Sequence, residues 1–325
     1  MAVVVAGDHA PEDVEMRAVF NDTLTDLARS DPRIMLLDAD LMVAMGTKPF
    51  AAEFPRQTVD CGVMEANMAG VAGGLSVEGF IPFVHTFAAF CSRRALDQIW
   101  LSCAYALTNV KVIGSDPGVT AALNGGTHMT FEDIGIMRMI PGATVVDPTD
   151  SVMLRDMLQK AASSYGMWYL RVFRRTAVKV YDSGSSFEVG KAVKLREGTD
   201  VSLIACGICV HEALRAQQLL ELRGVSAGVI DIVTVKPLDR TLILEEARRT
   251  RRIVTCENHS WMNGLGSAVA EVLAEEGTGK LSRVGVREEF GDVGSIDYLK
   301  TRFGLTGEDI AEAAVKLVSD KGPRA

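Results

Sequence analysis

Apolar runs of strand length alternate with helical patterns along this chain, and that alternation restricts the folds it can adopt. Glu15–Arg29 places apolar residues at helical spacing, and Arg33–Asp38 follows as a continuous apolar run. Such a run is typical of a strand buried on both faces of a parallel sheet. Thr58–Gly62 and Val110–Gly114 are further strand candidates. Strands joined through helices predict a parallel sheet covered on both faces.

The same alternation starts again in the second half of the chain. Asp182–Ser186 is polar and rich in Gly and Ser, which indicates a linker. Asp200–Ala205 then reads as a strand and Cys209–Leu222 as a helix. A chain of 325 residues is long enough for two domains of ordinary size. We therefore predict two doubly wound α/β domains, covering residues 1–183 and 188–325.

One carboxylate, Glu65, stands at the start of the apolar, Gly- and Ala-rich segment Met64–Leu75. Glycines in that segment would let a helix pack close to another backbone. An acid in the first turn of a helix also suits the helix dipole, so this residue has a purely structural interpretation. The segments that follow it in the sequence favour a functional interpretation.

Three short segments occur in order: Gly62–Met68, with the pattern Gly-x-x-Glu-x-x-Met; Thr86–Phe90, with Thr-Phe-x-x-Phe; and Gly125–His128, with Gly-x-Thr-His. Gly79–Phe83 is predicted as a strand, and Thr86–Phe90 as the beginning of a helix. Each segment alone is a weak signal. Their order resembles the transketolase family of thiamine-diphosphate enzymes, whose pyrimidine-binding domain precedes a C-terminal domain. The resemblance covers nearly the whole chain.

The resemblance implies roles for particular residues. Glu65 would hydrogen-bond the pyrimidine N1′ of the cofactor and assist loss of its C2 proton, and burial favours the protonated carboxyl that this role needs. Phe87 and Phe90 would stack against the pyrimidine ring, although the same i, i+3 spacing on a helix also suits core packing. His128 would handle the substrate oxygens. Asp40, at a predicted strand end, is a further cofactor-binding candidate.

Several positions depart from the pattern of sugar-phosphate transketolases. Asn124 replaces an acidic residue that recognises a donor hydroxyl, and Asp116 stands where a phosphate-binding His is common. Ala44 occupies a position expected to carry a Ser, whereas Arg174 matches a phosphate-binding Arg. His85 stands where the family has a small residue and is a candidate to face the cofactor. An anion beside Asp116 would be repelled, so we expect altered substrate recognition.

The family's diphosphate-binding domain carries a Gly-Asp-Gly segment, and none occurs in this sequence. The chain therefore resembles the β-type half of a split transketolase. A partner subunit would supply the diphosphate site and its Mg²⁺ or Ca²⁺, and an α2β2 heterotetramer is expected. Alternatives are the β subunit of a 2-oxoacid dehydrogenase E1 component, or a non-catalytic scaffold subunit. Deoxyxylulose-phosphate synthase is less favoured, because its chain normally includes the missing domain.

Composition limits the possible partners and compartments. The net charge of -8 argues against nucleic acid or an anionic membrane surface as a partner. We expect no signal peptide at the N-terminus and no membrane span. Six cysteines suggest no disulfide scaffold, so a reducing cytoplasm is the expected compartment. Cys206 and Cys209 form a lone C-x-x-C pair, which is either a redox pair or core filling.

Overall fold

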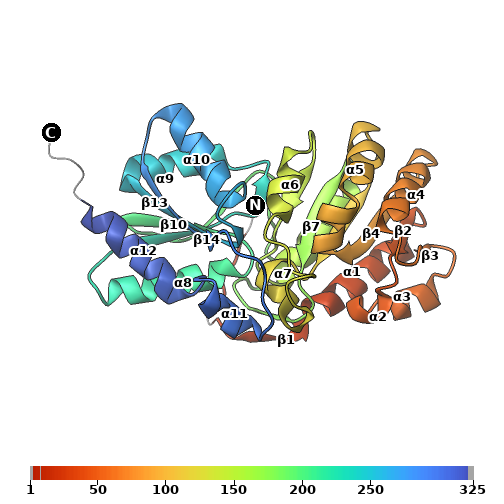
Figure 1. Ribbon diagram of the computed structural model, residues 1–325, viewed down its shortest axis with the longest axis horizontal. Helices are drawn as coiled ribbons and strands as arrows, with labels where there is room; N and C mark the ends of the chain where they lie inside the picture. Colours follow the sequence, from red (N-terminus) through yellow and green to blue (C-terminus); the bar gives the residue numbers. More distant parts are fainter. Residues whose placement is uncertain (1–2, 8, 321–325) are drawn as a thin grey trace.

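The computed structural model describes residues 3–7 and 9–320. Two β-sheets lie side by side along the long axis of the molecule (Figure 1). The first has seven strands in the order β12-β6-β7-β5-β4-β2-β3, and its six strands from β6 to β3 are parallel. The second has the order β14-β13-β10-β11-β9, with β9 antiparallel at its edge. This arrangement confirms the prediction of two α/β domains.

The helices and strands occur in the following order along the chain. The first half contains β1 (Pro11–Glu15), α1 (Met16–Ser30), β2 (Ile34–Asp38), α2 (Met42–Met45), α3 (Lys48–Glu53), β3 (Thr58–Asp60), α4 (Glu65–Val77), β4 (Ile81–Phe87), η1 (Phe90–Arg94), α5 (Leu96–Gln98), η2 (Ile99–Tyr105), β5 (Lys111–Ser115), η3 (Gly118–Asn124), α6 (Asp133–Met139), β6 (Thr144–Val146), α7 (Ser151–Ser163), β7 (Trp168–Val172) and β8 (Thr176–Val178). The second half contains β9 (Val193–Arg196), β10 (Val201–Ala205), α8 (Cys209–Glu221), β11 (Ala227–Asp231), β12 (Thr234–Lys236), α9 (Arg240–Thr250), β13 (Arg252–Ser260), α10 (Leu265–Glu276), β14 (Lys280–Val286), α11 (Ile296–Arg302) and α12 (Gly307–Ser319).

The apolar run of β2 is buried on both faces, as its composition predicts. Ile34 and Leu36 pack in the cluster that contains the buried side chains of α1 and α7. Met35 and Leu37 alternate with them and pack on the opposite face, in the cluster that includes α4. The helices on the two faces therefore sandwich the sheet.

Strand β4 corrects one sequence-based prediction. It runs to Phe87, so Thr86 and Phe87 lie in a strand and not in the helix that the local pattern predicts. Pairing with β5, in which Phe87 lies opposite Ser115, decides this outcome. Helical structure follows, and Phe90 opens the π-helix η1. Phe87 and Phe90 therefore do not share one face of a helix.

Strand β12 joins the two halves of the molecule. It follows β11 of the second sheet in the sequence, yet it pairs antiparallel with β6 of the first sheet. The Lys236 Nζ donates to the carbonyl oxygens of Arg138 and Ile140 at 2.9 and 2.6 Å. The second domain thus contributes an edge strand to the first. A strand of only three residues gives too short a sequence pattern to predict this pairing.

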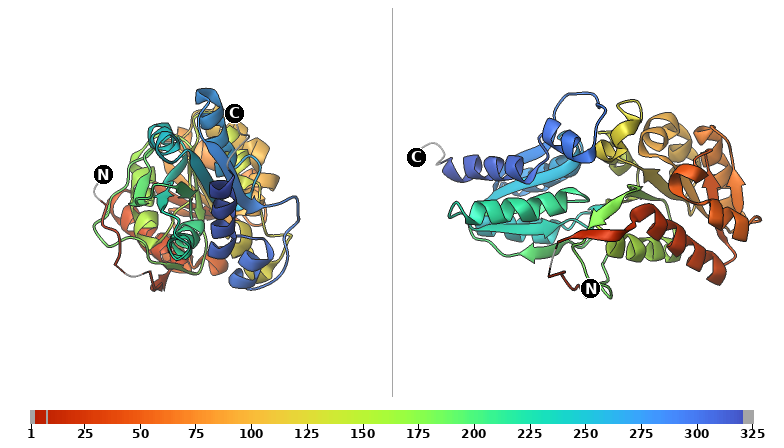
Figure 2. Two further views of the ribbon diagram at one scale, coloured as in Figure 1. Left: turned by 90° about the vertical axis from the view of Figure 1, so that its left-hand side faces the viewer. Right: turned by 90° about the horizontal axis from the view of Figure 1, so that it is seen from below.

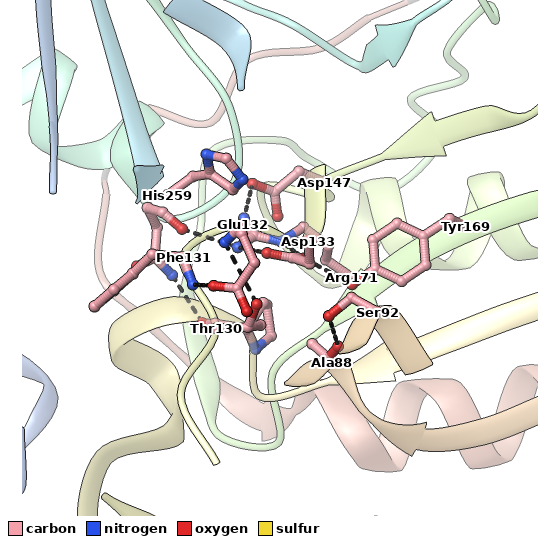
Figure 3. A network of polar contacts seen from close by, with 12 residues as sticks. Ala88, Ser92, Thr130, Phe131, Glu132, Asp133, Asp147, Tyr169, Arg171 and His259 are labelled. Carbon is pink, nitrogen blue, oxygen red and sulfur yellow. Dashed lines mark hydrogen bonds and ion pairs between the residues drawn. The ribbon is translucent and has the colours of Figure 1, made fainter. Parts of the chain in front are cut away.

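A buried ionic cluster crosses the same junction (Figure 3). Arg171 lies between Asp133 and Asp147, with N–O distances of 2.8 and 2.7 Å. The Arg171 Nη2 also donates to the carbonyl oxygen of Asn258, on β13, at 2.8 Å. Tyr169 donates to Asp133 at 2.6 Å. Buried charges persist when they are paired and hydrogen-bonded, and this cluster ties β13 to the first sheet.

The N-terminal segment passes along the junction of the two domains (Figure 2). Strand β1 pairs with β8, and Val5 forms a bridge with Tyr181. The predicted linker lies beside it, because the Ser185 hydroxyl accepts from the Val4 N–H at 3.0 Å. None of the helices within residues 3–7 and 9–320 has the length and apolar character needed to cross a membrane.

The cysteine pair lies in the core of the second domain. Cys206 and Cys209 are both buried and free. Burial raises the pKa of both thiols well above the ordinary value, which disfavours the reactive thiolate. Core packing is therefore the interpretation that this environment favours.

Candidate active site at the carboxyl ends of the first sheet

The segments singled out in the sequence analysis lie at the carboxyl ends of neighbouring strands of the first sheet. In the parallel register, Asp38 lies opposite both Asp60 and His85, and Phe87 lies opposite Ser115. These residues end, or nearly end, their strands, so the following loops emerge together. The carboxyl edge of an open α/β sheet is where such folds bind ligands.

Glu65 begins helix α4 at this edge and is only 2% exposed. Its Oε1 accepts from the Nη1 of Arg94 at 2.6 Å, and the Arg94 side chain is 47% exposed. Its Oε2 is buried and has no hydrogen-bond partner within the described chain. A buried polar atom without a partner is costly, so this oxygen is suited to a polar atom of a bound molecule.

Three rings form a group beside this ion pair. The centroids of Phe87 and Phe90 are 5.8 Å apart, and the His128 ring lies 5.4 Å from Phe87 and 5.2 Å from Phe90. Arg94 covers the Phe90 ring, with its guanidinium carbon 4.1 Å from the centroid. Arg174 stands 5.3 Å from the Phe87 centroid. The contacts therefore run without a break from Glu65, through the rings, to Arg174.

The turn between the strand and the π-helix brings the two phenylalanines together. Ser92, the third residue of η1, donates to the carbonyl oxygen of Ala88 at 2.6 Å and holds this turn. A π-helical turn is often found at functional sites. The geometry thus supports a ring wall at Phe87 and Phe90, reached by a different local structure from the predicted one.

The loop that carries His128 follows η3. Gly125 has a φ of +77°, a conformation that favours glycine. The His128 Nδ1 lies 2.9 Å from the Thr127 hydroxyl. The Nδ2 of Asn124 is buried and has no partner within the described residues. This amide therefore remains available to a bound molecule.

Asp116 is buried and pairs with Arg174, which corrects the expectation that its charge would repel an anion beside it. Its Oδ1 accepts from the Arg174 backbone N–H at 3.0 Å, and its Oδ2 accepts from the Arg174 Nε. Burial raises the pKa of the Asp116 carboxyl, and Arg174 partly opposes that shift. The local charge of this pair is close to zero while the carboxylate is ionised.

His85 lies in the interior at the end of the sheet. Its Nδ1 is 2.6 Å from the Asp38 Oδ2, and its Nε2 is 3.0 Å from the Ser115 hydroxyl. Both ring nitrogens are therefore engaged within the chain.

Asp40, the residue predicted to bind the cofactor, lies on an exposed turn with a φ of +61°, and Asp38 is the buried carboxylate. Ala44 lies in α2, where its carbonyl oxygen accepts from Arg17.

A cavity of about 320 Å³ continues from Arg174. Three residues singled out in the sequence line it from the first domain: Asp116, Asn124 and Arg174. Three residues of the second domain line its other side: Ser295, Ile296 and Asp297. We name this space the interdomain cavity. The sequence analysis missed Arg94, Arg175 and the second-domain wall, because no local pattern indicates which distant segments meet.

The chain matches two families over most of its length. Residues 12–178 match the family described as "Transketolase, pyrimidine binding domain", and residues 190–310 match "Transketolase, C-terminal domain". The chain is 50% identical over 309 residues to the 6-deoxy-6-sulfo-D-fructose transketolase subunit SqwH of Clostridium sp. (strain MSTE9), covering 95% of this chain and 96% of that protein. It is 32% identical over 310 residues to Homo sapiens transketolase, covering 94% of this chain and 49% of that protein.

Solved structures show the same similarity. One titled "Split gene transketolase, inactive beta4 tetramer" has a TM-score of 0.88 and 38% identity, and the match covers 95% of this chain and 100% of that chain. Transketolase from Leishmania mexicana has a TM-score of 0.81 at 22% identity, covering 99% of this chain and 47% of that chain. The second similarity shows the fold alone.

Proposed function

Because the chain belongs to the transketolase family, we propose that it is the subunit of a split transketolase that holds the pyrimidine end of thiamine diphosphate. The reaction is the transfer of a two-carbon ketol unit from a ketose to an aldose. Both matched families are named for transketolase, which favours this proposal over a 2-oxoacid dehydrogenase subunit.

The buried, unpartnered Oε2 of Glu65 carries this proposal. When bound, thiamine diphosphate supplies a carbon nucleophile and an electron sink beside the substrate carbonyl. Glu65 would hold a proton toward the pyrimidine N1′, while Arg94 keeps the other carboxyl oxygen in place. A scaffold subunit without catalysis would have no use for this arrangement. A positioned acid–base group is typically worth about 10²–10⁴ in rate.

The remaining residues border the cofactor and the substrate. Phe87 and Phe90 would lie against the pyrimidine ring and exclude water from it. His128 touches both rings and would donate to, or accept from, the carbonyl and hydroxyl oxygens of the substrate. Asn124 would bind a substrate hydroxyl through its free amide. An aspartate at that position could only accept, so the exchange alters which groups are recognised.

A partner chain with the diphosphate-binding domain would complete the site and hold Mg²⁺. The "subunit" in the name of the 50% identical relative and the "split gene" title of the similar structure support this division. We propose an α2β2 complex in the cytoplasm. A Cβ on Gly73 of α4 would collide with the Ser102 carbonyl oxygen, whereas a Cβ on Gly70 or Gly74 would meet nothing within 4 Å among the described residues, which leaves that side of α4 open for an interface.

Substrates with a tetrahedral anionic group at the far end fit the proposal best. The relative named for 6-deoxy-6-sulfo-D-fructose supports a sulfonate, and another, 34% identical over 306 residues, is named for apulose 4-phosphate. The changes at Asn124 and Ala44 support weak use of the pair xylulose 5-phosphate and ribose 5-phosphate, whereas the charge of Asp116 is offset by Arg174.

Reconstitution tests the proposal. The chain is mixed with a diphosphate-binding partner, thiamine diphosphate and Mg²⁺, and products are followed with a panel of ketoses and aldoses. We expect turnover only in the mixture, and an assembly containing two copies of each chain by light scattering. Full turnover by the purified chain alone would contradict the split arrangement. Absence of ketol transfer with every donor, including uncharged ones, would contradict the proposed reaction.

A further inference from the structure

Building on the proposed function, we infer that the anionic far end of the substrate binds between the two domains, to Arg175 and not to Arg174 alone. The interdomain cavity begins at Arg174, which also touches the Phe87 ring. A ketose whose reacting end lies at the rings would extend its other end into this space. The second domain therefore forms part of the specificity site.

The Arg175 guanidinium has only a weak ion pair, so it is available to bind an anion. Its side chain is 72% exposed, and its ion pair with Glu15 is long, at 3.8 Å from Nη1 to the carboxylate. Arg174, in contrast, is committed to Asp116 and to the ring of Phe87. A guanidinium offers a planar fork of donors that suits phosphate or sulfonate oxygens. Arg175 is therefore the better anion ligand of the two neighbours.

A second cavity, of about 250 Å³, adjoins the first. The two share Thr120, Arg175, Ile296 and Asp297. His211 lines the second cavity, and its Nδ1 is buried without a hydrogen-bond partner in the described residues. Burial lowers the pKa of His211, so its ring is a neutral polar group. This nitrogen is suited to a further oxygen of the same ligand, whereas the Thr120 hydroxyl already donates to the Pro117 carbonyl oxygen at 2.6 Å.

The charges that line the two cavities balance, but the ion pair of Arg175 is the longest among them. Lys300 pairs with Glu212 at 2.7 Å and with Asp297 at 3.0 Å, and Arg215 pairs with Glu212 at 2.9 Å. Arg174 offsets Asp116. Arg175 remains as the weakly paired charge. A tetrahedral oxyanion, from either a sugar phosphate or a sugar sulfonate, is the chemical class that would neutralise it.

Close backbone packing fixes the second-domain wall. A Cβ on Gly126 would collide with the carbonyl oxygen of Gly291, and a Cβ on Gly125 would lie 2.8 Å from the Val293 Cγ2. A Cβ on Gly291 would lie 2.8 Å from the Met129 Cβ. The loop that leads to Ser295 therefore rests on the loop that carries His128. This contact positions Asp297 relative to the reacting end of the site.

The test compares charged and uncharged donors in the reconstituted complex. Arg175→Ala should raise the KM for 6-deoxy-6-sulfo-D-fructose or D-fructose 6-phosphate by about 10–100-fold, with kcat nearly retained. The loss with L-erythrulose, which lacks an anionic end, should be at least tenfold smaller. Arg175→Lys should recover part of the affinity. The two charged donors distinguish sulfonate from phosphate as the preferred ligand.

A second variant is expected to change the KM for the charged donor in the opposite direction. Asp297→Asn removes a negative charge from the same space and should lower the KM for the charged donor by about 2–5-fold. Arg248→Ala is the matched control, because Arg248 is 63% exposed and also has a 3.8 Å pair, with Glu276. The control should change neither donor's KM.

Two results would overturn the inference. One is an equal loss with charged and uncharged donors in Arg175→Ala, and the other is no loss at all. Calorimetric binding of D-fructose 6-phosphate to wild-type and Arg175→Ala complexes requires no turnover. Sugar binding that depends on Arg175 in a complex that transfers no ketol unit would defeat the proposed reaction only. Ketol transfer with binding that is independent of Arg175 would defeat this inference only.

Discussion

The Glu65 carboxylate and the Arg94 guanidinium form a 2.6 Å ion pair in which the acid is 2% exposed and the base 47% exposed. The same guanidinium covers the Phe90 ring at 4.1 Å. One arginine thus holds both the carboxylate and the ring that the family resemblance associates with the cofactor. The pair leaves the Oε2 of Glu65 without a partner, and the following predictions test its role.

Replacing Glu65 by Gln should abolish turnover and leave assembly intact. The amide is nearly isosteric, so the packing loss is small, but it cannot exchange a proton as the acid does. We expect a reconstituted complex of normal size whose cofactor C2 proton exchanges with solvent about 10²–10⁴ times more slowly, measured by NMR. Near-normal exchange and turnover would mean that Glu65 is only an acid at a helix end.

Replacing Arg94 by Ala should destabilise the chain by about 1–3 kcal/mol, because it leaves a buried carboxylate without its partner. Urea unfolding of the isolated chain measures this effect. Arg93→Ala is the control, since Arg93 pairs with the partly exposed Glu132 at 3.2 Å, and it should cost less than about 1 kcal/mol.

A double-mutant cycle isolates the contribution of the pair. In the Glu65→Gln background the side chain is neutral, so Arg94→Ala should cost markedly less than in the wild-type chain. Equal costs in the two backgrounds would show that Arg94 acts through its packing on Phe90.

Truncating Phe87 to Ala should weaken cofactor binding about tenfold, because contact area and ring contacts are lost. Titration of thiamine diphosphate into the reconstituted complex provides the dissociation constant. Phe54→Ala removes a ring from another aromatic pair, with Phe50 at 5.1 Å, and serves as the control for general destabilisation. A similar loss of affinity in both variants would argue against a cofactor wall at Phe87.

Stability of the isolated chain should fall between about pH 4 and pH 7 through Asp231. Burial raises the pKa of its carboxyl from 3.8 to about 7, although Thr149 and Tyr181 donate to it. The folded chain then binds more protons than the unfolded chain in this window. Stability is therefore greatest at low pH for this group and is lost as pH rises, by at most about 1.4 kcal/mol per pH unit.

Unfolding in urea at pH 5 and pH 8 measures this dependence. Asp231→Asn cannot ionise, so its unfolding free energy should drop less between the two pH values than that of the wild type. Glu257, whose pKa burial also raises to about 7, should retain part of the slope. Asp22→Asn, at an exposed position, is the control. An unchanged slope in Asp231→Asn would contradict the assignment.

Patterns within short windows determined much of this protein. Apolar runs and helical spacing predicted strands at Arg33–Asp38 and Asp200–Ala205 and a helix at Cys209–Leu222. The structure confirms these elements, with bounds Ile34–Asp38, Val201–Ala205 and Cys209–Glu221. A continuous apolar run is informative because burial on both faces leaves no polar side to alternate. The glutamate at the start of a Gly-rich helix and each of the three motifs lie within single segments, and the order of the motifs can be read along the chain, so they were visible in the sequence.

Tertiary structure decided what depends on which distant segments meet. Pairing with β5 extended β4 to Phe87, and β12 crossed into the first sheet. The ion pairs Glu65–Arg94 and Asp116–Arg174, and the wall at Asp297, join residues 29, 58 and more positions apart. A side chain's partner is set by the register and packing of whole elements, and these are long-range cooperative properties. The sequence therefore determined the elements and the candidate groups, and the fold determined their charges, partners and reach.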